Sequence, residues 1–327
     1  MSPKAQNIDG ECSAITESER RSLRAAPRRA ARTSVAGIAP RPPGQDLRAR
    51  RGRSEAGVGR GDLSGTSIEA RTARIRVSLA PSPWARIGFV FRHTAHVYDL
   101  LYESAGKDYE AEADALHTLI QQRAPGAAAL LDVACGTGGH LVHLQRWYDV
   151  AGVDIDPGML DEARRRLPGV TLVQGDMRTF RVDGTCDAVT CLFSSVGYLR
   201  SERDLHEAVS TMASHLRPGG VFVMDGWIRP EAWTADAPIH LQTACDETLT
   251  VARMSRSRRE GNKTFLDMHH LIGSAEGIEH VVDTHELTLF ESGQYEESMH
   301  RAGLVDIETV ESPMPGRDRF VGVTTTH

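Results

Sequence analysis

The sequence predicts an α/β fold in which helices cover both faces of a mostly parallel, doubly wound sheet of seven strands. Short apolar runs typical of buried strands alternate with amphipathic helical stretches between residues 107 and 227. A glycine-rich turn follows the first of these strands, at the edge where open α/β sheets bind their ligands. Residues 240–290 instead show the two-residue periodicity of antiparallel strands, which predicts a β-rich insertion after the fifth strand.

The chain divides by composition before any motif is considered. Residues 1–80 contain no aromatic side chain and no histidine, and they carry 16 Lys and Arg against 8 Asp and Glu. A segment so poor in large apolar groups cannot offset the entropy cost of folding, so we expect residues 1–85 to be a disordered Arg-rich extension. It could bind nucleic acid or an acidic partner, serve as a transit peptide, or be a tail without function. We assign it no role in the mechanism.

The remaining residues, 86–327, are expected to form one catalytic domain. This body is acidic, which predicts no general attraction to nucleic acid. No apolar run of about 18 residues is present, so no membrane span is expected. The five cysteines are odd in number and form no CxxC pair, a pattern that favours a reduced, cytoplasmic protein.

The first half of this domain is predicted element by element. A helix over 107–123 has apolar residues at helical spacing and ends before an Ala-Pro-Gly stop signal. After this helix, the predicted strands are 129–134, 150–155, 171–176, 186–193 and 220–227. The predicted helices between them are 140–147, 158–167 and 201–216. Together, residues 93–227 form the expected cofactor-binding half.

The second half begins with the insertion, expected at about 238–290. Its turn, Glu-Gly-Asn at 260–262, predicts a β-hairpin, and residues 280–290 continue the antiparallel pattern. A C-terminal helix and hairpin then complete the core sheet within 291–327. Their predicted bounds are 293–302 for the helix and 304–311 and 319–326 for the strands.

The turn after the first strand narrows the choice of cofactor. Gly136 and Gly138 allow a tight strand-to-helix turn and let a ligand approach the backbone. The dinucleotide fingerprint GxGxxG would require a third glycine where Leu141 stands. The carboxylate of Asp132, just before the turn, would repel a pyrophosphate and attract a cationic amino-acid group.

Polar residues at the next two strand ends support the same ligand. Asp154 can accept hydrogen bonds from two ribose hydroxyls. Asp176 can accept a bond from an adenine amino group, and Met177 can pack on the ring. Each residue alone would more often be a helix cap or a core side chain. Their occurrence in order at successive strand ends favours S-adenosylmethionine.

With these motifs in place, residues 93–323 resemble the class I S-adenosylmethionine-dependent methyltransferases, which have a Rossmann-like fold. More narrowly, they resemble the N,N-dimethyltransferases of nucleotide-linked amino deoxysugars, of the kind that make desosamine and mycaminose for antibiotics. The segments that carry the resemblance are YDLLY (98–102), LLDVACGTGGHL (130–141), DPGMLDEARRR (156–166), QGDMRTF (174–180), DAVTCLFSSVGYL (187–199), SRREG (257–261) and THELTLF (284–290).

The resemblance implies which residues surround the cofactor and the methyl acceptor. The cofactor-side residues are Tyr98, Tyr109, Asp132, Ala134, Gly136, Gly138, Asp154, Met159, Asp176, Met177 and Leu192. The substrate-side residues are Ser194, Ser195, Trp227, Arg253, Arg256 and Arg317, and the resemblance implies that Arg317 reaches the nucleotide diphosphate. Apart from the resemblance, the insertion arginines, Arg253, Arg256, Arg258 and Arg259, would form either a phosphate-binding face or a solvated face of a strand. The chain departs from the family pattern on this acceptor side, for example at Gly226, where relatives often carry proline.

The implied reaction is N-methylation of an amino group on a nucleotide-linked deoxysugar. Tyr198, with His285 as a second candidate, would orient the amine or accept its proton. The alternatives are O- or N-methylation of another small metabolite, and a cofactor-binding subunit without catalysis. The histidines of the insertion, among them His269 and His270, are not expected to bind a metal because neighbouring strand residues point to opposite faces. The resemblance also implies a homodimer.

Overall fold

A computed structural model describes residues 91, 93–234 and 238–326 of the protein. The predicted N-terminal extension, residues 1–85, lies outside the described residues. Within the described part of the chain, no helix is both long and apolar enough to cross a membrane.

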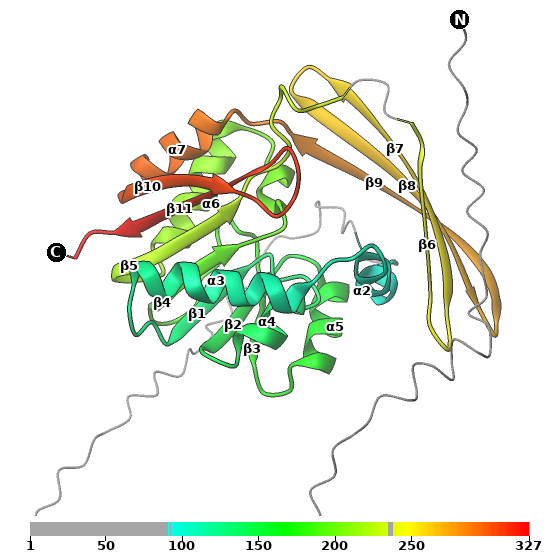
Figure 1. Ribbon diagram of the computed structural model, residues 1–327, viewed down its shortest axis with the longest axis horizontal. Helices are drawn as coiled ribbons and strands as arrows, with labels where there is room; N and C mark the ends of the chain where they lie inside the picture. Colours follow the sequence, from blue (N-terminus) through cyan, green and yellow to red (C-terminus); the bar gives the residue numbers. More distant parts are fainter. Residues whose placement is uncertain (1–90, 92, 235–237, 327) are drawn as a thin grey trace, which may run out of the picture. The chain divides into compact units, whose positions relative to one another are not determined.

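Seven strands form the core sheet in the order β10-β11-β5-β4-β1-β2-β3 (Figure 1). They are β1 (Ala129–Val133), β2 (Asp149–Asp154), β3 (Thr171–Gln174), β4 (Cys186–Cys191), β5 (Leu216–Asp225), β10 (Leu304–Glu311) and β11 (Asp318–Thr324). Strands β1 to β5 pair in parallel, whereas β11 runs antiparallel to both of its neighbours. The predicted seven-stranded, mostly parallel sheet is confirmed.

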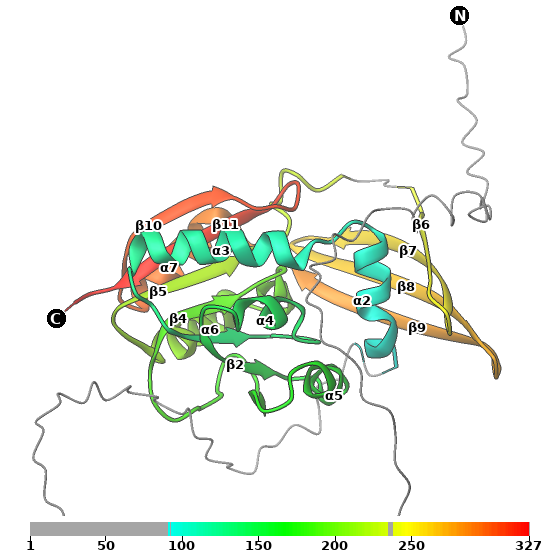
Figure 2. The ribbon, with the colours of Figure 1, turned by 60° about the horizontal axis from the view of Figure 1, so that its bottom comes forward.

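Helices cover both faces of this sheet (Figure 2). Apolar side chains of α3 (Tyr109–Arg123), α4 (Gly139–Leu144) and α5 (Pro157–Arg166) pack on one face. Those of α6 (Glu202–Ala213) and α7 (Ser292–Arg301) pack on the other. Alternate residues of each buried strand supply the two cores, which is why these strands read as nearly continuous apolar runs.

Polar caps set where several helices begin. The Asp108 carboxylate accepts a bond from the backbone of Ala111, so α3 begins at Tyr109 and not at the predicted residue 107. Asp156 caps α5, with Pro157 at its first position, and Ser201 caps α6. Helix α2 (Ala95–Ser104) packs against α5 and the insertion, and it was not predicted from the sequence.

The insertion after β5 is a separate four-stranded antiparallel sheet in the order β6-β7-β8-β9. Its strands are β6 (His240–Cys245), β7 (Thr250–Glu260), β8 (Lys263–Ser274) and β9 (Gly277–Thr288). The predicted turn at 260–262 joins β7 to β8, so the β-rich insertion is confirmed. Strand β6 was not singled out from the sequence. The inner face of the sheet buries Val251, Ile272 and Val281 with Val97 and Leu101 of α2.

Candidate active site

The turn after β1 has the backbone geometry that a close ligand requires. Gly136 and Gly138 have φ values of 56° and 77°, in the left-handed region that favours glycine. A Cβ at Gly138 would lie 2.6 Å from Cδ1 of Leu167, so this glycine allows α5 to pack closely. A Cβ at Gly136 would meet no atom within 4 Å, so its backbone faces open space. Ala134 also has a positive φ, 59°, which marks the whole turn as tightly wound.

Asp154 ends β2 beside this turn. Its two carboxylate oxygens accept backbone bonds of 2.8 Å from Gly136 and Asp156. Burial outweighs these bonds and raises the pKa of Asp154 to about 6. A carboxylate has about four acceptor positions, so lone pairs remain for two ligand hydroxyls. The structure therefore places Asp154 where the sequence analysis expected a ribose-binding group.

Asp132 is a deeply buried carboxylate at this edge. It is 2% exposed and accepts a bond of 2.7 Å from the Thr190 hydroxyl. Burial raises the pKa of Asp132 to about 7, and the nearby Asp154 and Asp225 raise it further. A buried carboxylate without a cationic partner favours a positively charged ligand group, because such a group would relieve the cost of burying its charge.

Of the four residues predicted around the adenine, Asp176 and Met177 follow β3, Leu192 follows β4, and Met159 lies in the first turn of α5. Met159 and Leu192 are each 3% exposed, and Met177 packs on the core. The carboxylate of Asp176, however, forms a paired contact with the guanidinium of Arg178, at 2.6 Å for the shorter bond. Arg178 therefore already occupies much of the hydrogen-bonding capacity that the sequence analysis assigned to an adenine amino group.

Tyr98 and Tyr109 come from the helices that precede the sheet. The Tyr109 ring lies against Gly139, where a Cβ would be 2.8 Å from its Cε1 atom, and its hydroxyl donates to Asp99. Tyr98 belongs to a series of aromatic contacts in which Phe91, Tyr98, Tyr102 and Phe193 follow one another with ring centroids 4.6–5.2 Å apart. This series connects α2 to the loop after β4.

A buried polar cluster beside Tyr109 was missed in the sequence. The Lys107 ammonium lies 2.7 Å from both oxygens of Glu112, which also accepts a 2.9 Å contact from His140. Burial opposes the ionisation of Glu112, but its bonds to His140 and Lys107 outweigh burial and lower its pKa to about 2. The same ammonium lies 4.1 Å from the ring centroid of Phe193. Lys107 thus joins the start of α3 to the loop after β4, a contact that no sequence spacing reveals.

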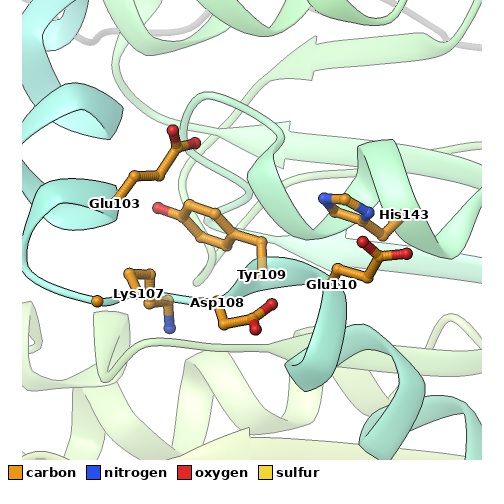
Figure 3. Close-up of a pocket in the computed structure, with 7 residues that line it drawn as sticks. Glu103, Lys107, Asp108, Tyr109, Glu110 and His143 are labelled. Atoms are coloured by element: carbon orange, nitrogen blue, oxygen red, sulfur yellow. The ribbon is translucent and has the colours of Figure 1, made fainter. Parts of the chain in front are cut away.

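A depression of about 440 Å³ lies at the α2–α3 connection (Figure 3). It is lined by Glu103, Gly106, Lys107, Asp108, Tyr109, Glu110 and His143. Most of these side chains are charged, and none comes from a strand end. We therefore do not assign the cofactor to this depression, although Tyr109 borders both it and the glycine turn.

The acceptor side is built around the short 3-10 helix η1 (Ser195–Tyr198). The Tyr198 hydroxyl oxygen lies 2.7 Å from Nδ1 of His285, which belongs to β9 of the insertion. Burial lowers the pKa of His285 to about 4 and raises that of Tyr198, so both groups are neutral near pH 7. The structure thus brings together the two residues that were predicted to be catalytic, one of them from the insertion.

Ser194, Trp227 and Arg317 lie together next to this pair. Arg317 donates a 3.0 Å bond to the Ser194 hydroxyl, and its guanidinium carbon lies 4.4 Å from the Trp227 ring centroid. Burial lowers the pKa of Arg317, and no described carboxylate lies within 4.0 Å of its guanidinium. The Ser195 hydroxyl donates to the backbone carbonyl of Leu192, three residues earlier in the same loop.

The insertion arginines do not form the single phosphate-binding face that was predicted. Arg253 is 8% exposed on the inner face of β7, whereas Arg256, three residues later, is exposed on the outer face. Successive residues of a strand point to opposite faces of the sheet, so two positions an odd number of residues apart cannot lie on the same face. Arg258 stacks on Phe265 and pairs with Glu260. Of the predicted pair, only Arg253 can face the acceptor side.

The same alternation separates the histidines. His269 is exposed on the outer face beside His280, with its Nδ1 atom 3.1 Å from Nε2 of His280, whereas His270 is 3% exposed on the inner face. The predicted separation of His269 from His270 is confirmed. No group of three or more metal-binding side chains occurs among the described residues.

Comparison with known proteins gives concordant results. A family model described as a methyltransferase domain matches residues 130–220. The dTDP-3-amino-3,4,6-trideoxy-alpha-D-glucopyranose N,N-dimethyltransferase of Streptomyces venezuelae is 46% identical over 70% of this chain and 97% of its own length. The dTDP-3-amino-3,6-dideoxy-alpha-D-glucopyranose N,N-dimethyltransferase of Streptomyces fradiae is 41% identical over 70% of this chain and 90% of its own.

A solved structure agrees with these matches. CalS10, an amino pentose methyltransferase from Micromonospora echinaspora involved in calicheamicin biosynthesis, has been solved with S-adenosylmethionine bound. It is 40% identical and superposes with a TM-score of 0.63 over 70% of this chain and 97% of its own. The similarity spans 90–97% of the length of each of these relatives.

Proposed function

The chain belongs to the family of S-adenosylmethionine-dependent N,N-dimethyltransferases that act on dTDP-linked amino deoxysugars, and from that premise we propose that it dimethylates the amino group of such a sugar. The observation that carries the proposal is the Tyr198–His285 contact. It joins the loop after β4 to the insertion, and so forms an acceptor site beside the cofactor-binding edge of the sheet.

The residues at that edge fit S-adenosylmethionine. Open space at Gly136 lets the ligand approach the backbone, and Asp154 keeps free lone pairs for ribose hydroxyls. Asp132 lies near the end where the cationic part of the ligand would bind, while Met177 and Leu192 supply apolar surface for the adenine. When bound, the cofactor supplies a methyl group already activated by its sulfonium sulfur.

Because the methyl group is already activated, the protein has mainly to position the amine in a dry pocket. An amine acts through its own lone pair and needs no strong base. A histidine with a pKa of about 4 would be a poor acceptor for the proton of an alkylammonium group. We therefore assign the Tyr198–His285 pair an orienting role: Tyr198 donates to Nδ1 of His285, and its oxygen accepts an N–H of the amine, which directs the lone pair toward the methyl group.

The substrate-side residues match the rest of such an acceptor. Arg317, stacked on Trp227 and without a carboxylate partner among the described residues, offers forked donors to a diphosphate. Ser194 holds this guanidinium in place by accepting from it while donating to the carbonyl of Gly226. Ser195 contributes to the acceptor site by stabilising the loop after β4, since its hydroxyl is bonded to the backbone of that loop.

The test uses the full chain with S-adenosylmethionine and a panel of dTDP-linked 3-amino and 4-amino deoxysugars. Mass spectrometry is expected to show a stepwise gain of one and then two methyl groups on one of these sugars. A panel of the same sugars without the nucleotide serves as the control for diphosphate recognition. If no sugar gains a methyl group while calorimetry still shows cofactor binding, the sugar assignment is wrong and only the methyltransferase fold stands.

A homodimer is also proposed, with the outer face of the insertion sheet as its interface. Leu241, Met254, His269 and Val282 face one another in register across β6 to β9. The three apolar members of this row are each 48–60% exposed, and Leu271 and Ile278 extend the apolar area. Monomeric proteins rarely leave so continuous an apolar face in water, and a second copy of the same sheet would cover it.

The cysteines support a cytoplasmic location. All four that the structure describes are unpaired, and Cys135, Cys186 and Cys191 are buried in the core. Free thiols persist in a reducing compartment, where the small-molecule acceptor and the cofactor would also be available.

A further inference from the structure

Three polar residues form one row on the inner face of the insertion sheet. Gln242 of β6 pairs in register with Arg253 of β7, which pairs in turn with His270 of β8. Arg253 and His270 are 8% and 3% exposed, so both are removed from water. Beyond His270 the row ends at the apolar Val281.

Arg253 is a buried cation without a counter-ion. No described carboxylate lies within 4.0 Å of its guanidinium, and its Nε atom has no hydrogen-bond partner. Gln242 accepts a bond from one end of the guanidinium, and the Gln242 amide in turn donates to the carbonyl of Leu101 in α2. A charged group so buried and so firmly positioned costs free energy unless a ligand supplies the missing anion.

His270 presents a second unpartnered atom beside it. Its buried Nδ1 has no hydrogen-bond partner, because the nearest oxygen of Asp283 is 3.9 Å away. That carboxylate accepts a 2.6 Å bond from the Thr94 hydroxyl, and burial raises the pKa of Asp283. Burial, followed by the charge of Arg253, lowers the pKa of His270 to about 4. His270 is thus a neutral imidazole that can donate one hydrogen bond.

Tyr102 connects this row to the arginine already assigned to the diphosphate. The guanidinium carbon of Arg253 lies 5.2 Å from the Tyr102 ring centroid. Burial lowers the pKa of Arg317, and the nearby Tyr102 hydroxyl partly offsets that effect. The Tyr102 ring also packs on Phe193, with ring centroids 5.0 Å apart, and the next residue, Ser194, accepts the bond from Arg317. Both unpaired arginines therefore lie near one tyrosine, although Arg253 comes from β7 and Arg317 from the loop between β10 and β11.

We propose that Arg253 is a second binding residue for the phosphoryl oxygens of the acceptor, in addition to Arg317. Gln242 holds the Arg253 guanidinium in position, and His270 donates a further hydrogen bond to the same oxygens. This inference rests on the proposed function, because only a diphosphate-linked acceptor carries two adjacent anionic phosphoryl groups. It makes the insertion sheet part of substrate recognition and not only a covering of the active site. Binding neutralises both buried cations at once.

The experiment measures binding of thymidine diphosphate and of thymidine to the full chain by calorimetry, with S-adenosylhomocysteine present. Arg253→Gln is expected to weaken thymidine diphosphate binding by about tenfold or more, and to change thymidine binding less than about twofold. Arg253→Lys should restore part of the loss, because it returns the charge without the fork. Arg256→Gln is the matched control, since the same charge is removed from the opposite face of the same strand.

Two results would overturn this inference and leave the proposed function intact. The first is an unchanged affinity for thymidine diphosphate in a folded Arg253→Gln variant. The second is an equal loss of affinity for thymidine, which would place Arg253 on the nucleoside. If Arg253→Gln does not fold, Gln242→Ala decides, since releasing the guanidinium should weaken diphosphate binding about threefold and no change would contradict the proposal. If the wild-type chain neither binds thymidine diphosphate nor methylates a dTDP-linked sugar, the proposed function fails and this inference fails with it.

Discussion

The hydroxyl oxygen of Tyr198 lies 2.7 Å from Nδ1 of His285, although the two residues are 87 positions apart, one at the end of η1 and the other in β9 of the insertion. The Phe91 ring also packs against His285, with ring centroids 5.0 Å apart. The insertion is thereby tied to the loop after β4 and to Phe91. An amine held by Tyr198 would be enclosed by all three, which explains how a small acceptor can be kept from water during methyl transfer.

Replacing Tyr198 by phenylalanine tests this arrangement. The change removes one hydroxyl and leaves Nδ1 of His285 without its partner, so we expect kcat/KM to fall about tenfold with little change in cofactor affinity. Tyr148→Phe is a matched control, because the Tyr148 hydroxyl contacts His117 at 3.0 Å just before the start of β2, at the opposite edge of the sheet from Tyr198. A kcat/KM for Tyr198→Phe within about threefold of wild type, under 1 kcal/mol of transition-state stabilisation, would reject the orienting role.

The core sheet and the cofactor turn could be predicted because their signals are local. Alternating apolar runs mark the strands, and Gly136 and Gly138 mark a turn whose positive φ values the structure confirms. The Lys107–Glu112–His140 cluster was not predictable, because it depends on how α3 and α4 pack.

The wrong prediction for the insertion arginines could have been avoided from the sequence alone. Arg253 and Arg256 stand three residues apart on a predicted strand, and that odd spacing already assigns them to opposite faces. Arg178 follows Asp176 by two residues, a spacing that allows the observed ion pair but does not require it. The contact between Tyr198 and His285 has no such local signal, since it depends on how β9 of the insertion packs against η1.

Gly138→Ala is expected to destabilise the protein and weaken cofactor binding. The added Cβ would lie 2.6 Å from Cδ1 of Leu167 in a backbone of φ 77°, so strain and steric overlap act together, at about 2–3 kcal/mol. Gly106→Ala shares the positive φ, 88°, but its Cβ meets nothing within 4 Å, so it should lose only about 1 kcal/mol. Urea unfolding of both variants measures the difference. Equal losses would show that the close packing of α5 is not what requires glycine at position 138.

Asp132 should make stability in the absence of cofactor depend on pH. Its folded pKa of about 7 lies above the ordinary value near 3.8, so the folded state holds this proton more tightly than the unfolded state. The stabilisation is present at low pH and is lost as the pH rises through about 7. Asp132→Asn cannot lose the proton and can still accept from Thr190. Its free energy of unfolding, relative to wild type, should therefore rise by about 2 kcal/mol between pH 5 and pH 8. A constant difference across that range in urea unfolding would contradict the raised pKa.

Charge placed on the outer face of the insertion should separate the proposed dimer. Leu271 is 49% exposed near the middle of that face, and Leu271→Asp would bury a carboxylate against the partner copy. The expected result is a shift from dimer to monomer in analytical ultracentrifugation at micromolar concentration. Val305→Asp is the control, because Val305 is 38% exposed on β10, outside the insertion.

Activity adds a second readout. Since Tyr198 and His285 come from the same chain, the monomer should keep its kcat for the amino sugar. A dimer that persists in Leu271→Asp, or a wild-type chain that sediments as a monomer, would show that the apolar face has another role.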